Sequence, residues 1–207
     1  MINFLTENFL GFYKFLYSLT NDYGLALILF TFLFRLSILP LSYLVFKEEI
    51  KLKKIRPKIK NLMEKHKNDP LKQLEEINKI YQEEKFNPFL SIVFQFLPFP
   101  LLIAIFFLLK KILAENKNLM FLGVINLASK NPILIGLTIF FQFLSVYLFN
   151  KEDLKNQFLL IGLIALVIIN FPAIFSIYWL TNLILLIIEK KLFLFYEEKL
   201  KPISLEK

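Results

Sequence analysis

Long apolar segments alternate with charged segments along this chain. Four long runs are apolar, 23–46, 87–109, 131–150 and 156–188, and Arg35 in the first is the one charged residue within them. A helix needs ~20 apolar residues to cross the ~30 Å hydrocarbon core of a bilayer, and a backbone in lipid must satisfy its own hydrogen bonds. The pattern therefore predicts an all-α integral membrane protein.

The last apolar run is too long for a single membrane span. It is interrupted by the sequence INFPA at 169–173, where Pro172 removes a backbone donor and disfavours helix at Phe171. We therefore expect a bundle of five transmembrane helices, the last two of them short. They are placed at 23–46, 88–109, 131–149, 156–170 and 172–189.

The first segment, 1–22, carries apolar residues at nearly helical spacing, interrupted by Glu7, Asn8 and Lys14. This pattern favours an amphipathic helix lying in the membrane interface. An irregular lead-in to the first span is the alternative. Segment 1–22 has neither the basic start nor the cleavage site of a secretory signal. Because no transit peptide is evident either, a bacterial plasma membrane is the expected location.

The basic residues predict the orientation of the spans. Lys and Arg number 25, and 19 of them lie in the segments 47–87 and 150–155 together with the tail 190–207. The N-terminal segment and the loop 110–130 hold five. Because cytoplasmic loops are enriched in Lys and Arg, we expect the N-terminus outside and the C-terminus in the cytoplasm.

The charged segment 47–87 has a regular apolar seam. Ile55, Ile59 and Leu62 recur at helical spacing, and a second set begins at Leu71. Between the two sets, Asp69 is a good N-cap and Pro70 suits a first helical position. The segment therefore predicts a cytoplasmic antiparallel helical hairpin, although a floppy charged loop is possible from the pattern.

Arg35 lies inside the first apolar run, where a permanent charge is costly. On a straight helix it shares a face with Gly24, Thr31 and Ser42. The other predicted spans carry hydroxyls and amides but no carboxylate at depth, so no partner in this chain is expected. An unpaired arginine favours a hydrated groove that attracts anionic groups, whereas one that binds carbonyls at a broken helix would be structural.

Several function classes find no support in the composition. The chain has no cysteine, one histidine and five glycines, and 57% of its residues are hydrophobic, with a mean hydropathy of +0.57. Neither a zinc site nor a glycine-rich phosphate loop can be recognised. We expect a protein that is not an enzyme and that binds no small-molecule cofactor.

Five segments resemble, in order and spacing, the YidC/Oxa/Alb family of membrane-protein insertases. They are YGLALILFTFLFRLSILPLS at 23–42, the hairpin 55–88, PLLIAIFFLL at 100–109, ILIGLTIFFQ at 133–142 and NFPAIFSIYWLTNLI at 170–184. The chain departs from the family pattern at FLSI, residues 89–92, and at Pro98 and Phe143.

The resemblance implies insertion and folding of client membrane proteins through a hydrophilic intramembrane groove, without nucleotide hydrolysis. The expected partners are nascent membrane proteins and the lipid bilayer, with the ribosome and a Sec-type translocon as further candidates. The expected groove residues are Arg35, Thr31, Ser42, Gln95, Gln142, Tyr178, Trp179 and Asn182, and Lys65, Lys67 and Asp69 are candidates for client or ribosome recruitment. A small-solute transporter or anion channel is the alternative, as is a purely structural membrane protein.

Overall fold

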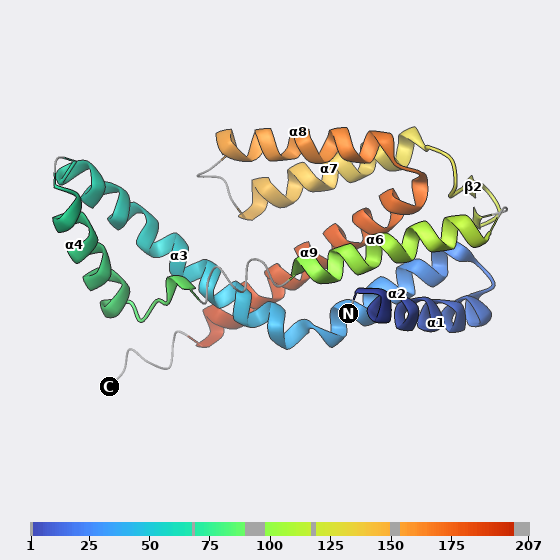
Figure 1. Cartoon of the computed structure of the whole chain (residues 1–207), viewed down its shortest axis with the longest axis horizontal. Coiled ribbons are helices and arrows are strands. Elements are labelled where there is room, and N and C mark those ends of the chain that lie inside the picture. Colours follow the sequence, from blue (N-terminus) through green and yellow to red (C-terminus); the bar gives the residue numbers. More distant parts are fainter. Residues whose placement is uncertain (1, 68, 90–97, 117–118, 150–153, 201–207) are drawn as a thin grey trace. The chain divides into compact units, whose positions relative to one another are not determined.

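The computed structural model describes residues 2–67, 69–89, 98–116, 119–149 and 154–200 (Figure 1). The described residues are almost entirely helical. The helices are α1 (Ile2–Thr20), α2 (Tyr23–Ser37), α3 (Leu39–Lys65), α4 (Pro70–Glu83), α6 (Pro98–Glu115), α7 (Pro132–Phe149), α8 (Leu154–Asn170) and α9 (Ala173–Leu200). A two-stranded antiparallel hairpin, β1 (Met120–Phe121) and β2 (Ile125–Asn126), is the one element type that the sequence pattern did not predict.

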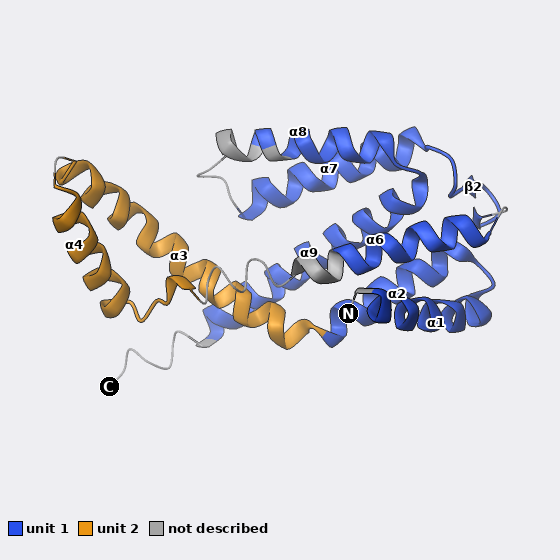
Figure 2. Cartoon of the chain, in the orientation of Figure 1, with its two compact units in different colours: residues 1–37, 102–207 blue, residues 38–101 orange. Residues whose placement is uncertain are grey.

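The chain divides into two compact units (Figure 2). The first, the bundle unit, comprises 1–37 and 102–207, and the second, the hairpin unit, comprises 38–101. The boundary falls at Ile38, between α2 and α3. Pro40 lies in the first turn of α3, where its missing N–H costs nothing, but it cannot continue a helix from α2. The segment 23–46, expected as one span, is therefore divided between two helices, and its crossing of the membrane as one span stays a prediction.

Two helices among the described residues are long and apolar enough to cross a membrane, Pro132–Phe149 and Ala173–Lys199. The number rises to three if α2 and α3 are taken together as one bent span. The described part of the chain is thus an all-helical protein with membrane-spanning character, and the five-span bundle stays a prediction.

The core of the bundle unit forms where α1, α2, α6 and α9 meet. Tyr13, Leu27, Phe30, Leu108 and Ile174 are among its fully or almost fully buried side chains. On α1 the buried face faces α2, whereas Phe4, Phe12, Phe15 and Leu19 remain exposed on other faces. The first segment is therefore a helix rather than an irregular lead-in, and its outward phenyl rings fit an interfacial position.

Tyr13 also joins α1 to the start of α2. Its hydroxyl donates a hydrogen bond of 2.9 Å to the carbonyl of Tyr23. Burial raises the pKa of Tyr13 above its ordinary value, so the phenol remains a donor throughout the physiological pH range. Ion pairs of 2.8 Å between Lys14 and Glu115 and of 2.6 Å between Lys111 and Glu7 link α1 to α6.

The β-hairpin organises one end of the bundle unit. Its turn places Leu122 and Gly123 at positive φ, a conformation that glycine adopts without strain. Asp22 contacts it from the start of α2: one carboxylate oxygen accepts from the backbone N–H of Leu25 at 2.8 Å and the other from that of Leu122 at 2.6 Å. A single aspartate thus caps α2 and holds the hairpin against it.

The same loop satisfies the first donors of α9. The backbone N–H groups of Ala173 and Ile174 donate to the carbonyls of Ser129 and Leu127, at 2.8 and 3.1 Å. Helix N-termini carry N–H groups without intrahelical partners, so these bonds fix where α9 begins. The break between α8 and α9 falls at Phe171 and Pro172, which confirms the interruption predicted at INFPA.

The last helix is not short, contrary to the sequence-based expectation. α9 has 28 residues, or ~42 Å at ~1.5 Å per residue, and continues through Glu189, Lys190 and Lys191 to Leu200. The apolar residues after these charges, among them Leu192 and Phe195, extend its hydrophobic character.

The hairpin unit consists of α3 and α4 packed together. Asp69 caps α4 as predicted, since its carboxylate accepts from the backbone N–H of Lys72 at 3.1 Å, with Pro70 in the first turn. Ile55 is fully buried, whereas Leu71 and Leu74 are exposed, so the predicted seam is wrong at the start of α4.

An ion pair joins the two helices at the other end of the hairpin unit. The side chains of Lys58 and Glu84 form a salt bridge with a hydrogen bond. The hydrogen bond raises the pKa of the Lys58 ammonium and lowers the pKa of the Glu84 carboxyl, so both groups remain charged at neutral pH.

We predict that Gly24→Ala destabilises the bundle unit. A Cβ atom at position 24 would meet the side chain of Phe121, including its Cβ atom at 2.8 Å, which no side-chain rotation can move away. Overpacking of this kind costs ~1–3 kcal/mol. Gly136→Ala is the matched control, because nothing lies within 4 Å of a Cβ there. Thermal unfolding in detergent should show a lower Tm for the first variant and an equal or higher Tm for the second; equal losses would contradict the contact.

Candidate functional site

Arg35 lies in the last turn of α2, a helix that is otherwise uncharged. The guanidinium cannot lose its proton in a protein, so the helix must supply partners or water for five N–H donors. Only 14% of the Arg35 side chain is exposed. The charge is thus largely enclosed by the bundle unit, and its contacts decide what it does.

Three contacts hold the guanidinium against α9. Its Nε donates to Oδ1 of Asn182 at 2.9 Å, and Nη1 donates to Oε2 of Glu189 at 2.7 Å. Nη2 lies 3.5 Å from the carbonyl oxygen of Asn182, at the outer limit of a hydrogen bond. Two residues of one helix therefore fix both the position and the plane of the guanidinium.

Glu189 corrects the expectation that Arg35 has no carboxylate partner in its own chain. The two form a salt bridge, and only 7% of the Glu189 side chain is exposed. Sequence analysis missed it because Glu189 lies at the end of the last apolar run, where a charge is read as the start of a tail. Asn182 and Glu189 are seven residues apart, which places them on one face of a helix, and this spacing was the available signal.

The pair removes the main argument for a water-filled groove. That argument required an unpaired charge, whereas the observed charge is paired and hydrogen-bonded. A buried arginine without a partner would be costly in an apolar bundle, and Glu189 and Asn182 lower this cost. Arg35 therefore joins α2 to α9, and a hydrated groove around it stays a prediction.

Four of the predicted groove residues belong to the α7–α9 part of the bundle unit. Trp179 donates from its indole Nε1 to Oε1 of Gln142 at 3.3 Å, which links α9 to α7. Tyr178 is buried and lies within electrostatic range of Arg35. Asn182, one turn after these residues, binds Arg35 itself. The structure thus brings polar side chains of three helices together within an apolar unit.

The remaining groove candidates are not brought to this cluster. Thr31 is buried, and its hydroxyl donates to the carbonyl of Leu27 in its own helix at 2.7 Å. Ser42 belongs to α3 in the hairpin unit, and Gln95 lies outside the described residues. Gly24, expected on the same face as Arg35, instead packs against Phe121. Ser42 was expected on the face of Arg35 only because one straight helix was assumed, and the break at Ile38 removes that assumption.

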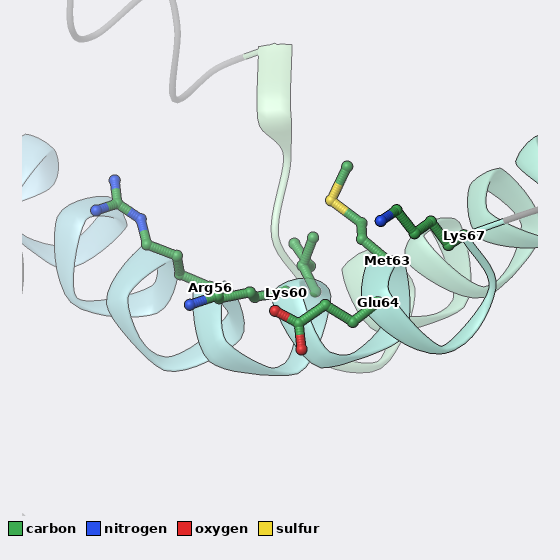
Figure 3. Close-up of a pocket in the computed structure, with 6 residues that line it drawn as sticks. Arg56, Lys60, Met63, Glu64 and Lys67 are labelled. Carbon is green, nitrogen blue, oxygen red and sulfur yellow. The ribbon is translucent and has the colours of Figure 1, made fainter.

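The recruitment candidates lie around the tip of the hairpin unit. Lys67 lines a shallow hollow on α3 together with Arg56, Ile59, Lys60, Met63 and Glu64 (Figure 3). Lys65 is exposed next to it, and Asp69 is used as the N-cap of α4. Three basic side chains and the carboxylate of Glu64 surround Ile59 and the exposed Met63.

No group of three or more His, Cys, Asp or Glu side chains that could hold a metal ion occurs within the ranges that the structure describes. The one histidine, His66, lies 3.3 Å from Glu76 in the hairpin unit. It makes a local contact between the end of α3 and α4, and only 13% of its side chain is exposed.

Comparison with known proteins gives one family. The family model described as "60Kd inner membrane protein" matches residues 15–199. A protein named "Membrane protein insertase YidC" from Aquifex aeolicus (strain VF5) is 34% identical over 190 residues, which is 86% of this chain and 36% of the relative. A protein of the same name from Clostridium tetani (strain Massachusetts / E88) is 33% identical over 159 residues, covering 75% of this chain and 72% of the relative.

A third protein of that name, from Endomicrobium trichonymphae, is 28% identical over 191 residues, covering 85% of this chain. The chain spans little more than a third of the length of several of these relatives, including the Aquifex protein at 36%. The match of the family model nevertheless includes both units of the structure and the Arg35 cluster.

We predict that Arg35→Met destabilises the protein, because it leaves the Glu189 carboxylate buried without its partner. Breaking a buried ion pair in this way costs ~3–5 kcal/mol, whereas replacing both partners with apolar residues is close to neutral. Arg35→Met combined with Glu189→Leu should therefore unfold at a higher temperature than Arg35→Met alone. Lys191→Met, on an exposed position of α9, serves as the control. If the double variant is the least stable, the ion pair is not the origin of the loss.

Proposed function

Because this chain belongs to the YidC/Oxa/Alb family of membrane-protein insertases, we propose that it inserts and folds client membrane proteins in a bacterial plasma membrane. The observation that carries the proposal is the Arg35–Asn182–Glu189 cluster, a polar site with a permanently charged guanidinium in a helical unit that has an apolar core. No nucleotide hydrolysis enters this mechanism. The driving forces are hydrophobic burial and the membrane potential.

The cluster addresses the main energetic obstacle to insertion. A polar segment that enters hydrocarbon loses hydrogen bonds to water, at a cost of several kcal/mol for each unsatisfied group. Arg35 lies ~18 Å along α2 from its start, at ~1.5 Å per residue. A client carboxylate held there has already crossed part of the bilayer while its apolar segment partitions into lipid.

In this mechanism the polar residues next to Arg35 form the wall of a hydrophilic groove. Gln142 and Trp179 present an amide and an indole, and Asn182 orients the guanidinium. The membrane potential acts on acidic tails with ~2.3 kcal/mol per charge per 100 mV. Arg35 supplies the transient attraction, and the potential supplies the direction of transport.

We place the helical hairpin of residues 47–87 and the C-terminal end of α9 in the cytoplasm and the β-hairpin loop outside. The support is the excess of Lys and Arg in the first two segments. On this orientation the basic hollow with Lys67, and Lys65 beside it, faces the ribosome or a Sec-type translocon and serves to recruit clients. In this mechanism Asp69 stabilises the hairpin as the N-cap of α4 and does not contact a client or the ribosome.

A small-solute transporter or anion channel is the second candidate, since Arg35 could bind a small anion. The Arg35–Glu189 pair disfavours it, because the pair has no net charge in the resting protein. Family membership also favours the insertase.

We predict that liposomes containing the purified protein insert a short single-span client without added ATP. Protease protection of the client tail measures the insertion. Empty liposomes and liposomes with Arg35→Met/Glu189→Leu are the controls, and the latter should lose insertion of acidic-tailed clients while remaining folded. Release of entrapped anions in the absence of client insertion would favour the transporter.

We predict that single cysteines report the proposed orientation, because the chain has no natural cysteine. Lys67→Cys should react with a membrane-impermeant maleimide only after the membrane is permeabilised, and Lys130→Cys should react in intact cells. Both side chains are exposed, so burial does not limit either reaction. Labelling of Lys67→Cys in intact cells would reverse the topology.

A further inference from the structure

The ion pair between Arg35 and Glu189 uses only part of the arginine. A guanidinium can bind a carboxylate through two parallel hydrogen bonds, which is the strongest arrangement for this pair. Here Nη1 alone donates to Glu189, at 2.7 Å, and Nη2 faces a carbonyl at 3.5 Å. The bidentate position of the guanidinium is therefore incompletely filled.

The carboxylate of Glu189 is also incompletely bonded. Its Oε2 accepts from Arg35, but its Oε1 is buried and has no hydrogen-bond partner within the described part of the chain. A buried acceptor without a donor is unfavourable compared with the same group in water. Each partner of the pair thus retains bonding capacity that the other does not satisfy.

We propose that Glu189 is an internal competitor for the Arg35 site and thereby determines which clients the site accepts. In the resting protein Glu189 occupies the position of a client carboxylate. An acidic client displaces it by binding Nη1 and Nη2 together. This inference rests on the proposed function and names the chemistry that the site selects, a carboxylate on the translocated part of a client.

The exchange requires little movement of the backbone. Asn182 binds Nε, which neither carboxylate needs, and so holds the guanidinium plane in both states. Glu189 is followed at once by Lys190 and Lys191, where α9 becomes charged. The exchange requires only that the Glu189 side chain change its rotamer and leave Nη1 of Arg35.

Competition makes the site selective. Specificity is a difference of affinities, and an occupant that must be displaced raises the threshold for every ligand. A neutral amide or hydroxyl cannot replace the charge of Glu189 on Arg35, so neutral tails are not held. Glu189 also neutralises Arg35 in the absence of a client, so the empty site does not leave an unpaired charge in the bundle.

The test measures binding and insertion separately, with the full chain in nanodiscs and in liposomes. Two dye-labelled client peptides differ only by one Asp or Asn in the tail, and fluorescence anisotropy gives their Kd values. Glu189→Gln keeps a neutral acceptor for Nη1 but weakens the competitor. It should lower the Kd of the Asp peptide roughly tenfold, the range of a charge-assisted against a neutral hydrogen bond, and change that of the Asn peptide less than about twofold.

Two further variants make the result specific. Glu198→Gln removes an equal charge from an exposed position of the same helix and should change neither Kd. Arg35→Gln combined with Glu189→Gln should abolish the difference between the two peptides. Glu189→Asp keeps the charge but shortens the side chain, so it should also tighten binding of the Asp peptide.

The inference is overturned if Glu189→Gln leaves the Kd of the Asp peptide unchanged or weakens both peptides alike. If that variant does not fold, as judged from its Tm, Glu189→Asp decides, and unchanged or weaker binding of the Asp peptide overturns the inference. If the Asp peptide binds more tightly but the liposomes insert neither client, the competitor is supported and the proposed insertase function fails. If both clients insert and Glu189→Gln has no effect that depends on tail charge, only the competitor fails.

Discussion

A permanent charge within an apolar helix is the constraint on which the rest of this structure depends. Arg35 cannot be neutralised by losing its proton, so the bundle must compensate it. Asn182 and Glu189 do so from one face of α9, and their contacts join two helices that are far apart in the sequence. Arg35 thus contributes to the cohesion of the bundle, and in our proposal the same guanidinium also binds the carboxylate of a client.

The placement of α2 and α9 follows from the hydrogen bonds made at their first residues. Asp22 caps α2 and binds the β-hairpin, and the residues after that hairpin accept the first hydrogen bonds of α9. Both helices that carry the Arg35 cluster therefore start at one small loop. The loop defines their relative register, and the register in turn brings position 182 next to position 35.

Much of the fold can be predicted from the sequence, because lipid imposes strong rules on apolar runs. The helical class, the break at Pro172 and the cap at Asp69 all follow from local chemistry. The errors have a common cause, which is that boundaries depend on tertiary contacts. Pro40 could kink a helix or end one, and the structure ends α2 at Ser37. Charges at 189–191 could end α9, but the helix continues to Leu200.

The candidate site was predicted less completely than the fold. Arg35, Asn182, Gln142 and Trp179 were identified as polar groups at depth, and the structure brings them into two linked contacts on α9. Glu189 was missed because a charge that ends an apolar run does not reveal whether it points into the bundle. The hydroxyl of Thr31 binds the carbonyl of Leu27 in its own helix, and its place in a groove stays a prediction.

The uninterrupted course of α9 has a mechanical consequence. The helix is a stiff rod that is fixed at its first residues to the loop carbonyls of Leu127 and Ser129 and carries Glu189 ~24 Å further along, at ~1.5 Å per residue. A small tilt about the fixed end is therefore amplified with distance and is largest beyond the ion pair. A displacement of the last turns of α9 therefore acts directly on the Arg35–Glu189 contact.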